Sequence, residues 1–215
     1  MWELSQIDSL VDFRRLLSSL ALRTGDVLNQ SELAREIGIS QPTVYRDVRL
    51  LEVSNLVSRI PPFFASRTKR LVKTPKAFFV DPGLSVYLAG YHDPQALQGA
   101  RERGGFSETL VLLHLRIASE LSVPHAKVHF WRTGTGKEVE FVLETGRVSL
   151  AFEVKVTRSP SLRDAENLLA LFDESPSTVR GVLLHRGSEV KWVHSKALAV
   201  PWWWSWVEEA GSPES

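Results

Sequence analysis

One short stretch restricts the fold of this chain more than any other, because it predicts two helices separated by a glycine turn. The segment "LNQSELAREIGIS" predicts a first helix, in which Asn29 caps the N-terminus and Gly38 ends the last turn. Ser40 caps a second helix, "QPTVYRDVRLLE", with Pro42 in its first turn, where a missing N–H costs nothing. Two helices joined by so tight a turn are typical of a helix-turn-helix.

The second of these helices divides into an apolar and a polar face. Val44, Val48 and Leu51 recur at helical spacing and predict the face that packs on the core. The other face offers donors for base edges and phosphates, as a recognition helix must. The predicted DNA contacts on it are Gln41, Thr43, Tyr45, Arg46 and Arg49, with both arginines expected to project from the core. The alternative is a three-helix packing unit with a solvated basic face.

A basic hairpin is predicted directly after these helices. "LVSRI" and "LVKTPKAFFV" predict strands, and "PPFFASRTKR" predicts the loop between them. The stretch Arg59–Lys76 holds six basic residues and no acidic one. Such a wing can lie along a phosphate backbone, unless it is only a hairpin kept soluble by its charge. Its predicted DNA contacts are Arg67, Lys69, Arg70 and Lys73. With a helix over 7–22, these elements predict a winged helix-turn-helix DNA-binding domain at residues 1–90.

The remaining chain predicts a mixed α/β domain at residues 104–207, after a loop-like boundary segment rich in glycine and polar residues. The order is a helix over 108–121 capped by Ser107, three strands, a helix over 161–174 and one further strand. The strands are "KVHFWR", "EVEFVLE", "VSLAFEVKV" and "VRGVLLH", with "VKWVHS" as the candidate for another. The end, "PWWWSWVEEAGSPES", predicts an aromatic helix or turn and then a disordered tail at 208–215.

Carboxylates and one lysine form the candidate chemical site. Glu153 and Lys155 lie two apart on a strand and therefore share a face. If the preceding strand pairs beside it, Glu140 can converge on Glu153, and Glu108 could add a third carboxylate. Two carboxylates suit a hard cation such as Mg²⁺, and a nearby lysine can orient water or offset charge on a phosphate. The alternative is a solvated Glu–Lys pair, although burial in an apolar strand makes that arrangement costly.

Composition excludes several classes of function. The chain has no cysteine, which excludes disulfides, thiolate catalysis and cysteine-based zinc sites. No apolar run reaches the roughly 18 residues of a membrane helix, and no Walker A pattern provides a nucleotide site. His125 and His129 lack metal-ligand spacing and are predicted to be surface residues. We therefore expect a cytoplasmic protein without membrane contact.

The chain also resembles a known family over nearly its whole length. The similarity runs through "LALRTGDVLNQSELAREIGISQPTVYRDVRLLEVSNLV", "RLVKTPKAFFVDPGL", "GGFSETLVL", "FWRTGTGKEVEFVL" and "FEVKV". These segments resemble the C-terminal region of a large group of prokaryotic AAA-type ATPases, a domain of unknown function. In that family a winged helix precedes a domain similar to PD-(D/E)XK nucleases, whose core has the α-β-β-β-α-β order predicted here.

The resemblance implies roles for four residues. It maps the acid of the nuclease helix to Glu108, the first metal carboxylate to Glu140, and the E-x-K motif to Glu153 and Lys155. Glu140 and Glu153 would then bind Mg²⁺ or Mn²⁺. The family usually has Asp at the position of Glu140, and the longer Glu side chain alters where a metal would lie.

The ATPase part of the family precedes the point where this chain begins, so the chain is either a stand-alone protein or part of a longer ATPase. Three hypotheses follow. The chain is a DNA-binding protein with a metal-dependent deoxyribonuclease domain, or a module that grips DNA or protein without catalysis. In the third, the winged helix serves protein docking or dimerisation. The expected partners are DNA, an ATPase domain or a second copy of the chain.

Overall fold

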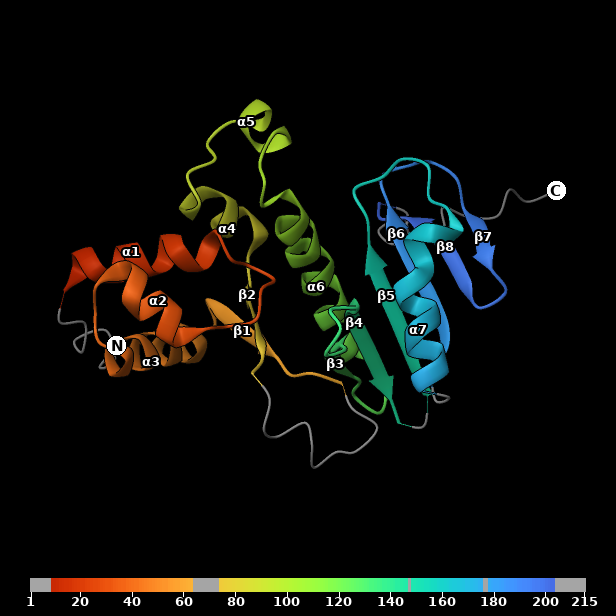
Figure 1. Ribbon diagram of the computed structural model, residues 1–215, viewed down its shortest axis with the longest axis horizontal. Coiled ribbons are helices and arrows are strands. Elements are labelled where there is room, and N and C mark those ends of the chain that lie inside the picture. Colours follow the sequence, from red (N-terminus) through yellow and green to blue (C-terminus); the bar gives the residue numbers. More distant parts are fainter. Residues whose placement is uncertain (1–8, 64–73, 147, 176–177, 204–215) are drawn as a thin grey trace. The chain divides into compact units, whose positions relative to one another are not determined.

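A computed structural model describes residues 9–63, 74–146, 148–175 and 178–203 (Figure 1). The chain divides into two compact units, residues 1–117 and residues 118–215. The described elements combine helices with two sheets, which confirms the predicted mixed α/β class. No helix among the described residues is both long enough and apolar enough to cross a membrane.

The first unit contains the predicted winged helix-turn-helix. Its elements are α1 (Leu10–Ala21), α2 (Gln30–Ile37), α3 (Gln41–Val53), β1 (Val57–Ile60) and β2 (Lys76–Phe79). The two strands pair antiparallel. The expected caps form, since Asn29 accepts from the Glu32 N–H at 3.2 Å and Ser40 from the Thr43 N–H at 3.2 Å. Gly38 ends α2 with φ 81°, a left-handed conformation that favours glycine.

The core of this domain gathers apolar side chains from every one of these elements. Val44, Val48 and Leu51 are buried, as their spacing on α3 predicts. They join a cluster that includes Leu16, Leu20, Leu33, Val57, Ala77 and Phe79. The inner face of α3 is therefore fixed by packing, which leaves its outer face free for other uses.

Three more helices follow in the chain, α4 (Pro82–Leu88), α5 (Pro94–Gln98) and α6 (Arg103–Leu121). The segment expected to be a loop thus holds α5. The prediction that Ser107 caps a helix beginning at Glu108 is wrong, because α6 begins at Arg103 and the Ser107 hydroxyl donates to the Arg103 carbonyl at 2.9 Å. Gly105 was expected in the loop but lies in α6, where it allows close packing. A Cβ at this position would lie 2.2 Å from the Thr24 carbonyl oxygen.

The second unit is built on a six-stranded sheet in the order β3-β4-β5-β6-β8-β7. Its strands are β3 (Lys127–Arg132), β4 (Glu138–Thr145), β5 (Val148–Val154), β6 (Thr178–His185), β7 (Lys191–His194) and β8 (Ala197–Pro201). β5, β6 and β8 run parallel, and the other neighbouring strands pair antiparallel. A 3-10 turn, η3 (Leu162–Ala165), and α7 (Glu166–Glu174) connect β5 to β6, and α7 packs over β4, β5 and β6 (Figure 1).

In this unit the sequence analysis missed one strand and misplaced one histidine. β8 was not predicted, because "ALAVP" is short and alanine is depleted in strands, yet this strand lies between β6 and β7. His129, expected at the surface, is only 5% exposed, with its Nε2 3.3 Å from the Glu144 carboxylate on the paired strand β4. Trp204, Trp206 and the predicted tail lie outside the described residues.

Candidate functional site

The pairing of β4 with β5 brings the two predicted metal carboxylates together. Phe141 on β4 lies opposite Phe152 on β5, and this antiparallel register continued by one residue sets Glu140 opposite Glu153. Directly opposed residues have Cβ atoms about 4.5–5.5 Å apart. The Glu140 carboxylate also accepts from the Val154 N–H at 3.3 Å, which directs it towards β5. Two acidic side chains therefore share one point in the interior of the sheet.

Glu153 is at the centre of this arrangement and is fully buried, with 0% of its surface exposed. Its Oε1 lies 2.5 Å from the Lys155 ammonium nitrogen and accepts from the Asn167 amide of α7 at 3.3 Å. Within the described part of the chain, its Oε2 has no hydrogen-bond donor. One oxygen is thus held in place by two donors, while the other is buried and has no donor among the described residues.

The electrostatics of the site show the cost of burying Glu153. Burial raises the pKa of Glu153 above its ordinary value, and the Lys155 ammonium, the Glu140 carboxyl and the Asn167 amide only partly oppose that rise. A carboxylate in such surroundings gains from a further positive charge. A cation next to Oε2 would supply that charge, and so would a proton.

Asn167 is the member of this cluster that the sequence did not indicate. It lies on α7, whose Leu168, Leu171 and Phe172 are buried against the sheet. The apolar spacing of that helix predicts its buried face. It does not predict which strand the polar residue at the margin will reach, so no sequence signal assigned Asn167 to Glu153.

Glu108, the remaining predicted site residue, is paired within the first unit. Its Oε2 lies 3.7 Å from the ammonium of Lys76 on β2, a side chain that is only 3% exposed. A Cβ on Gly25 would lie 3.0 Å from the same oxygen, so the carboxylate is closely surrounded there. Glu108 neutralises a buried lysine, and its role as a metal ligand stays a prediction.

Any cation at this site would depend on few protein ligands. Among the described residues, no group of three or more His, Asp or Glu side chains is placed to hold a metal ion. Glu140 and Glu153 would therefore be the protein ligands, with water or substrate oxygens completing the shell. Mg²⁺ accepts this arrangement, since it usually retains several waters and binds one or two carboxylates together with substrate phosphates.

On α3, the exposed side chains form a single stripe. Gln41, Tyr45 and Arg49 are exposed and recur every four residues, so they lie on one helix face. Arg46, expected to project with Arg49, is instead half-buried, with its Nε 3.1 Å from the buried Asp47 carboxylate. Thr43 is engaged in the helix cap, 2.8 Å from the Ser40 hydroxyl. The wing residues predicted to contact DNA, Arg67, Lys69, Arg70 and Lys73, lie outside the described residues.

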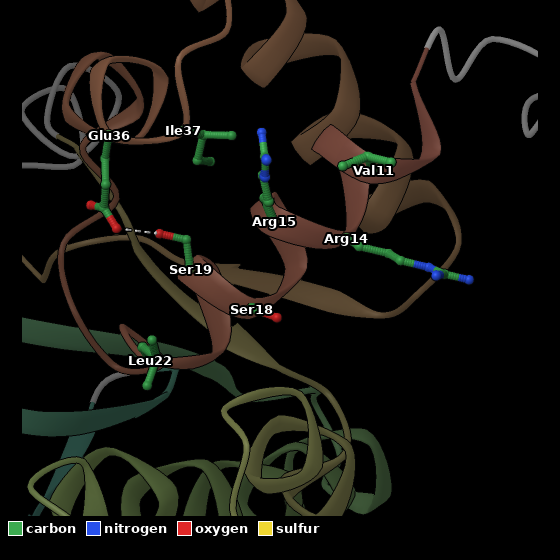
Figure 2. A pocket seen from close by; sticks show the side chains of 8 residues that line it. All are labelled: Val11, Arg14, Arg15, Ser18, Ser19, Leu22, Glu36 and Ile37. Atoms are coloured by element: carbon green, nitrogen blue, oxygen red, sulfur yellow. Dashed lines mark hydrogen bonds between the residues drawn. The ribbon is translucent and has the colours of Figure 1, made fainter.

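A groove of about 690 Å³ lies between α1 and the end of α2. Figure 2 shows Ser19 facing Glu36 across it, where the hydroxyl donates to the carboxylate at 3.0 Å. Val11 and Leu22 line it together with Arg14 and Arg15, and both apolar side chains are exposed. A groove that combines apolar and basic groups in this way suits contact with another protein more than it suits catalysis.

The two halves of the chain match two family models. Residues 1–95 match a domain of unknown function, DUF8612. Residues 103–204 match a second domain of unknown function, DUF4143. The second match agrees with the resemblance seen in the sequence, because DUF4143 is commonly a C-terminal part of AAA-type ATPases. A link between this chain and an ATPase stays a prediction.

Similar proteins include the uncharacterized proteins Rv2008c of Mycobacterium tuberculosis and Mb2031c of Mycobacterium bovis. Each is 32% identical over 149 residues, which is 69% of this chain and 33% of the relative. The chain therefore spans about a third of the length of these relatives. Among solved structures, S. aureus MepR bound to ethidium bromide aligns over 56% of this chain and 71% of its own, at 21% identity and a TM-score of 0.28.

Proposed function

We propose that the chain binds DNA through its winged helix-turn-helix and that its second unit hydrolyses phosphodiester bonds with the help of Mg²⁺ or Mn²⁺. The observation that carries the proposal is Glu153, a fully buried carboxylate with a second carboxylate, Glu140, opposite it and with one oxygen that receives no hydrogen bond from the described residues. Lys155 and Asn167 engage only Oε1 of Glu153, and a metal ion is the partner that Oε2 and the Glu140 carboxylate together suit.

DNA binding is supported by the outer face of α3. Gln41 and Arg49 offer hydrogen-bond donors and Tyr45 an exposed ring, on a helix whose inner face is fixed by the core. This is how a recognition helix presents side chains to the major groove. The basic residues of the wing add the positive charge that attracts a phosphate backbone.

Within the site, each residue has a separate role. Glu140 and Glu153 would hold the metal ion, which when bound supplies Lewis-acid polarisation of a phosphate oxygen. Lys155 fixes Glu153 through its Oε1, and its ammonium group can also offset negative charge that develops on the phosphate. Asn167 positions Glu153 by donating to the same oxygen, so that Oε2 would be the oxygen left for the metal ion.

The test uses purified protein incubated with plasmid and single-stranded DNA in Mg²⁺, Mn²⁺ or EDTA. Glu153→Gln keeps the shape but removes a ligand charge, so cleavage should fall by orders of magnitude, and Lys155→Ala should abolish it as well. Glu138→Gln is the matched control, because Glu138 lies on the neighbouring strand β4, two residues before Glu140, but pairs with Arg132. Cleavage that persists in Glu153→Gln would show that this site does not catalyse it.

Metal binding is measured separately by thermal unfolding. A ligand at 100 times its Kd stabilises the folded state by about 2.7 kcal/mol. Mn²⁺ should therefore raise the melting temperature of the unmodified chain and of Lys155→Ala, but not that of Glu153→Gln. The same shift in Glu153→Gln would place the metal elsewhere.

The alternative is a module that binds without catalysis. It is favoured by the short contact between Lys155 and Glu153, since an ammonium group can itself neutralise the carboxylate in place of a metal. In that case neither divalent ion would shift the melting temperature, and no condition would give cleavage above the Glu153→Gln background.

A further inference from the structure

Three basic side chains meet beyond the carboxyl ends of β5 and β6. A pocket of about 460 Å³ opens there between the segment after β5, the segment after β6 and the start of β7. It is lined by Arg158, Ser159, Arg186, Ser188, Lys191 and Trp203, among others. Parallel strands commonly bind ligands outside their carboxyl ends, so the place itself is suited to a ligand.

The pocket carries an excess of positive charge. Arg158, Arg186 and Lys191 are exposed, and in the described part of the chain none of them has a carboxylate oxygen within 4 Å. Glu189 is the acidic residue among those that line the pocket, so the cations outnumber it. The hydroxyls of Ser159 and Ser188 add groups that can donate to an anion.

A buried histidine holds the wall of this pocket in place. His185 is fully buried, its Nδ1 accepts from the Gly187 N–H at 2.9 Å, and its Nε2 lies 3.1 Å from the Glu189 carbonyl, to which it donates. Burial lowers the pKa of His185, which favours the neutral ring that this pair of bonds requires. A Cβ on Gly187 would lie 2.2 Å from the Arg158 carbonyl oxygen, so the two segments touch.

The pocket lies close along the chain to the carboxylate site. The ladder between β5 and β6 continues past the strands, because the Lys155 N–H donates to Leu184 and the Arg186 N–H donates to Thr157, both at 2.8 Å. Arg158 is three residues beyond Lys155, so their Cα atoms are at most roughly 10 Å apart. A polymer that reached one site could therefore extend into the other.

Trp203 indicates which chemical group of the ligand would lie beside the anion. Its Nε1–H donates to the Gly187 carbonyl at 3.2 Å, while 44% of the residue stays exposed. With its polar atom engaged, the exposed part of the side chain is aromatic ring. The bases of a single strand stack on exposed rings of this kind, whereas bases inside a duplex are already stacked on their neighbours.

We propose that this pocket binds an unpaired nucleotide of a nucleic-acid strand, with Arg158, Arg186 and Lys191 on the phosphate and Trp203 against the base. The proposal rests on the proposed function, since it supplies a second contact for the strand whose backbone would reach Glu153. The second unit would then prefer single-stranded nucleic acid, a preference that DNA binding by the winged helix does not require.

The test measures binding of labelled oligothymidylate to the full chain by fluorescence anisotropy, in EDTA and at several salt concentrations. Each phosphate contact with a single strand contributes about 0.7 to the slope of log K against log salt. Arg158→Ala with Arg186→Ala should lower that slope by about 0.7 and weaken binding. Lys127→Ala with Arg163→Ala removes the same charge from exposed residues outside the pocket and should leave the slope unchanged.

Trp203→Ala should weaken binding about tenfold without changing the slope, because stacking releases no counterions. Trp203→Phe keeps a ring but lacks the N–H, so it should retain most of the affinity. Loss of binding in both Trp203 variants alike would contradict stacking. An oligouridylate of equal length shows whether RNA serves as well as DNA, and either result agrees with an unpaired nucleotide.

Two outcomes would overturn the proposal. One is a slope that falls equally in the arginine pair and in its control, which would mean general charge attraction. The other is an equal loss for duplex and single strand, which would mean that no unpaired base is bound. Because the measurement is made in EDTA, failure here leaves the cleavage test of Glu153 untouched, and absence of cleavage leaves this result standing.

Discussion

On α3 the polar side chains lie outside a core that is complete without them, whereas on β5 the charged side chains are part of the core. Gln41 and Arg49 are exposed above the buried Val48 and Leu51. Glu153 is fully buried beneath α7, among groups that each restrain it. Exposed residues such as those on α3 can be substituted without loss of stability. Substitution of a buried charged residue such as Glu153 also changes the stability of the fold.

This difference suggests how the two regions would respond to substitution. Exposed side chains on a helix contribute little to the free energy of unfolding, usually within about 0.5 kcal/mol. Buried polar groups contribute more, in either direction, because their partners are lost with them. Substitutions at three places test the contrast: the outer face of α3, Glu153 on β5, and the pair of Glu108 with the buried Lys76 in the first unit.

The largest effect is expected at Glu108. Glu108→Ala would leave the Lys76 ammonium, which is 3% exposed, without this carboxylate, and breaking a buried ion pair in this way costs about 3 kcal/mol. Urea unfolding measures the change. Glu120→Ala is the control on the same helix, since that side chain is exposed and its loss should cost less than about 0.5 kcal/mol.

The outcome at Glu108 also bears on the role that the family resemblance assigns to it. Full stability in Glu108→Ala together with loss of cleavage would favour a metal ligand over a structural partner of Lys76. A large loss of stability with cleavage retained under folding conditions would favour the structural role.

A smaller effect is expected on the outer face of α3. Tyr45→Ala and Arg49→Ala should each weaken duplex binding about tenfold, because one good contact contributes about 1–3 kcal/mol, while the melting temperature stays unchanged. Leu51→Ala on the same helix should instead destabilise the fold by about 2–5 kcal/mol. Duplex binding that is indifferent to both surface changes and to salt would favour the α1 groove and the protein-docking hypothesis.

The same contrast explains which features could be predicted from the sequence. The helices α2 and α3 were predictable because their signals are local: Asn29, Gly38 and Ser40 mark the ends, and Val44, Val48 and Leu51 mark the buried face of α3. The half-burial of Arg46 was not predictable in this way. Arg46 contacts Asp47, a polar residue whose burial departs from the apolar spacing of the helix.

In the second unit the sequence predicted the order of elements and the face shared by Glu153 and Lys155, since strand alternation is also local. It did not predict β8, whose pairing between β6 and β7 depends on distant strands. Nor did it predict Asn167, because contact between α7 and β5 depends on how the helix lies on the sheet. Features that depend on the packing of elements distant in the sequence were therefore missed, whereas the approach of Glu140 to Glu153 was predicted because their strands follow one another in the chain.

The smallest and most specific effect is the dependence of stability on pH at Glu153. Its pKa in the folded state is raised, chiefly by burial, so between the ordinary carboxyl pKa and the raised value the folded state binds more protons than the unfolded state. Stability must then fall as pH rises through that window and remain at the lower level above it. Glu153→Gln cannot lose a proton, so its melting temperature in EDTA should exceed that of the unmodified chain by a few degrees at neutral pH and by less at acid pH. His185 titrates in both proteins with a lowered pKa, and its effect cancels in the difference. Mn²⁺ should close the gap in the unmodified chain alone. If the difference in melting temperature between the two proteins stayed constant with pH, ionisation of Glu153 would cost the folded state nothing. The contrast between the exposed residues of α3 and the buried site on β5 would then not hold for Glu153.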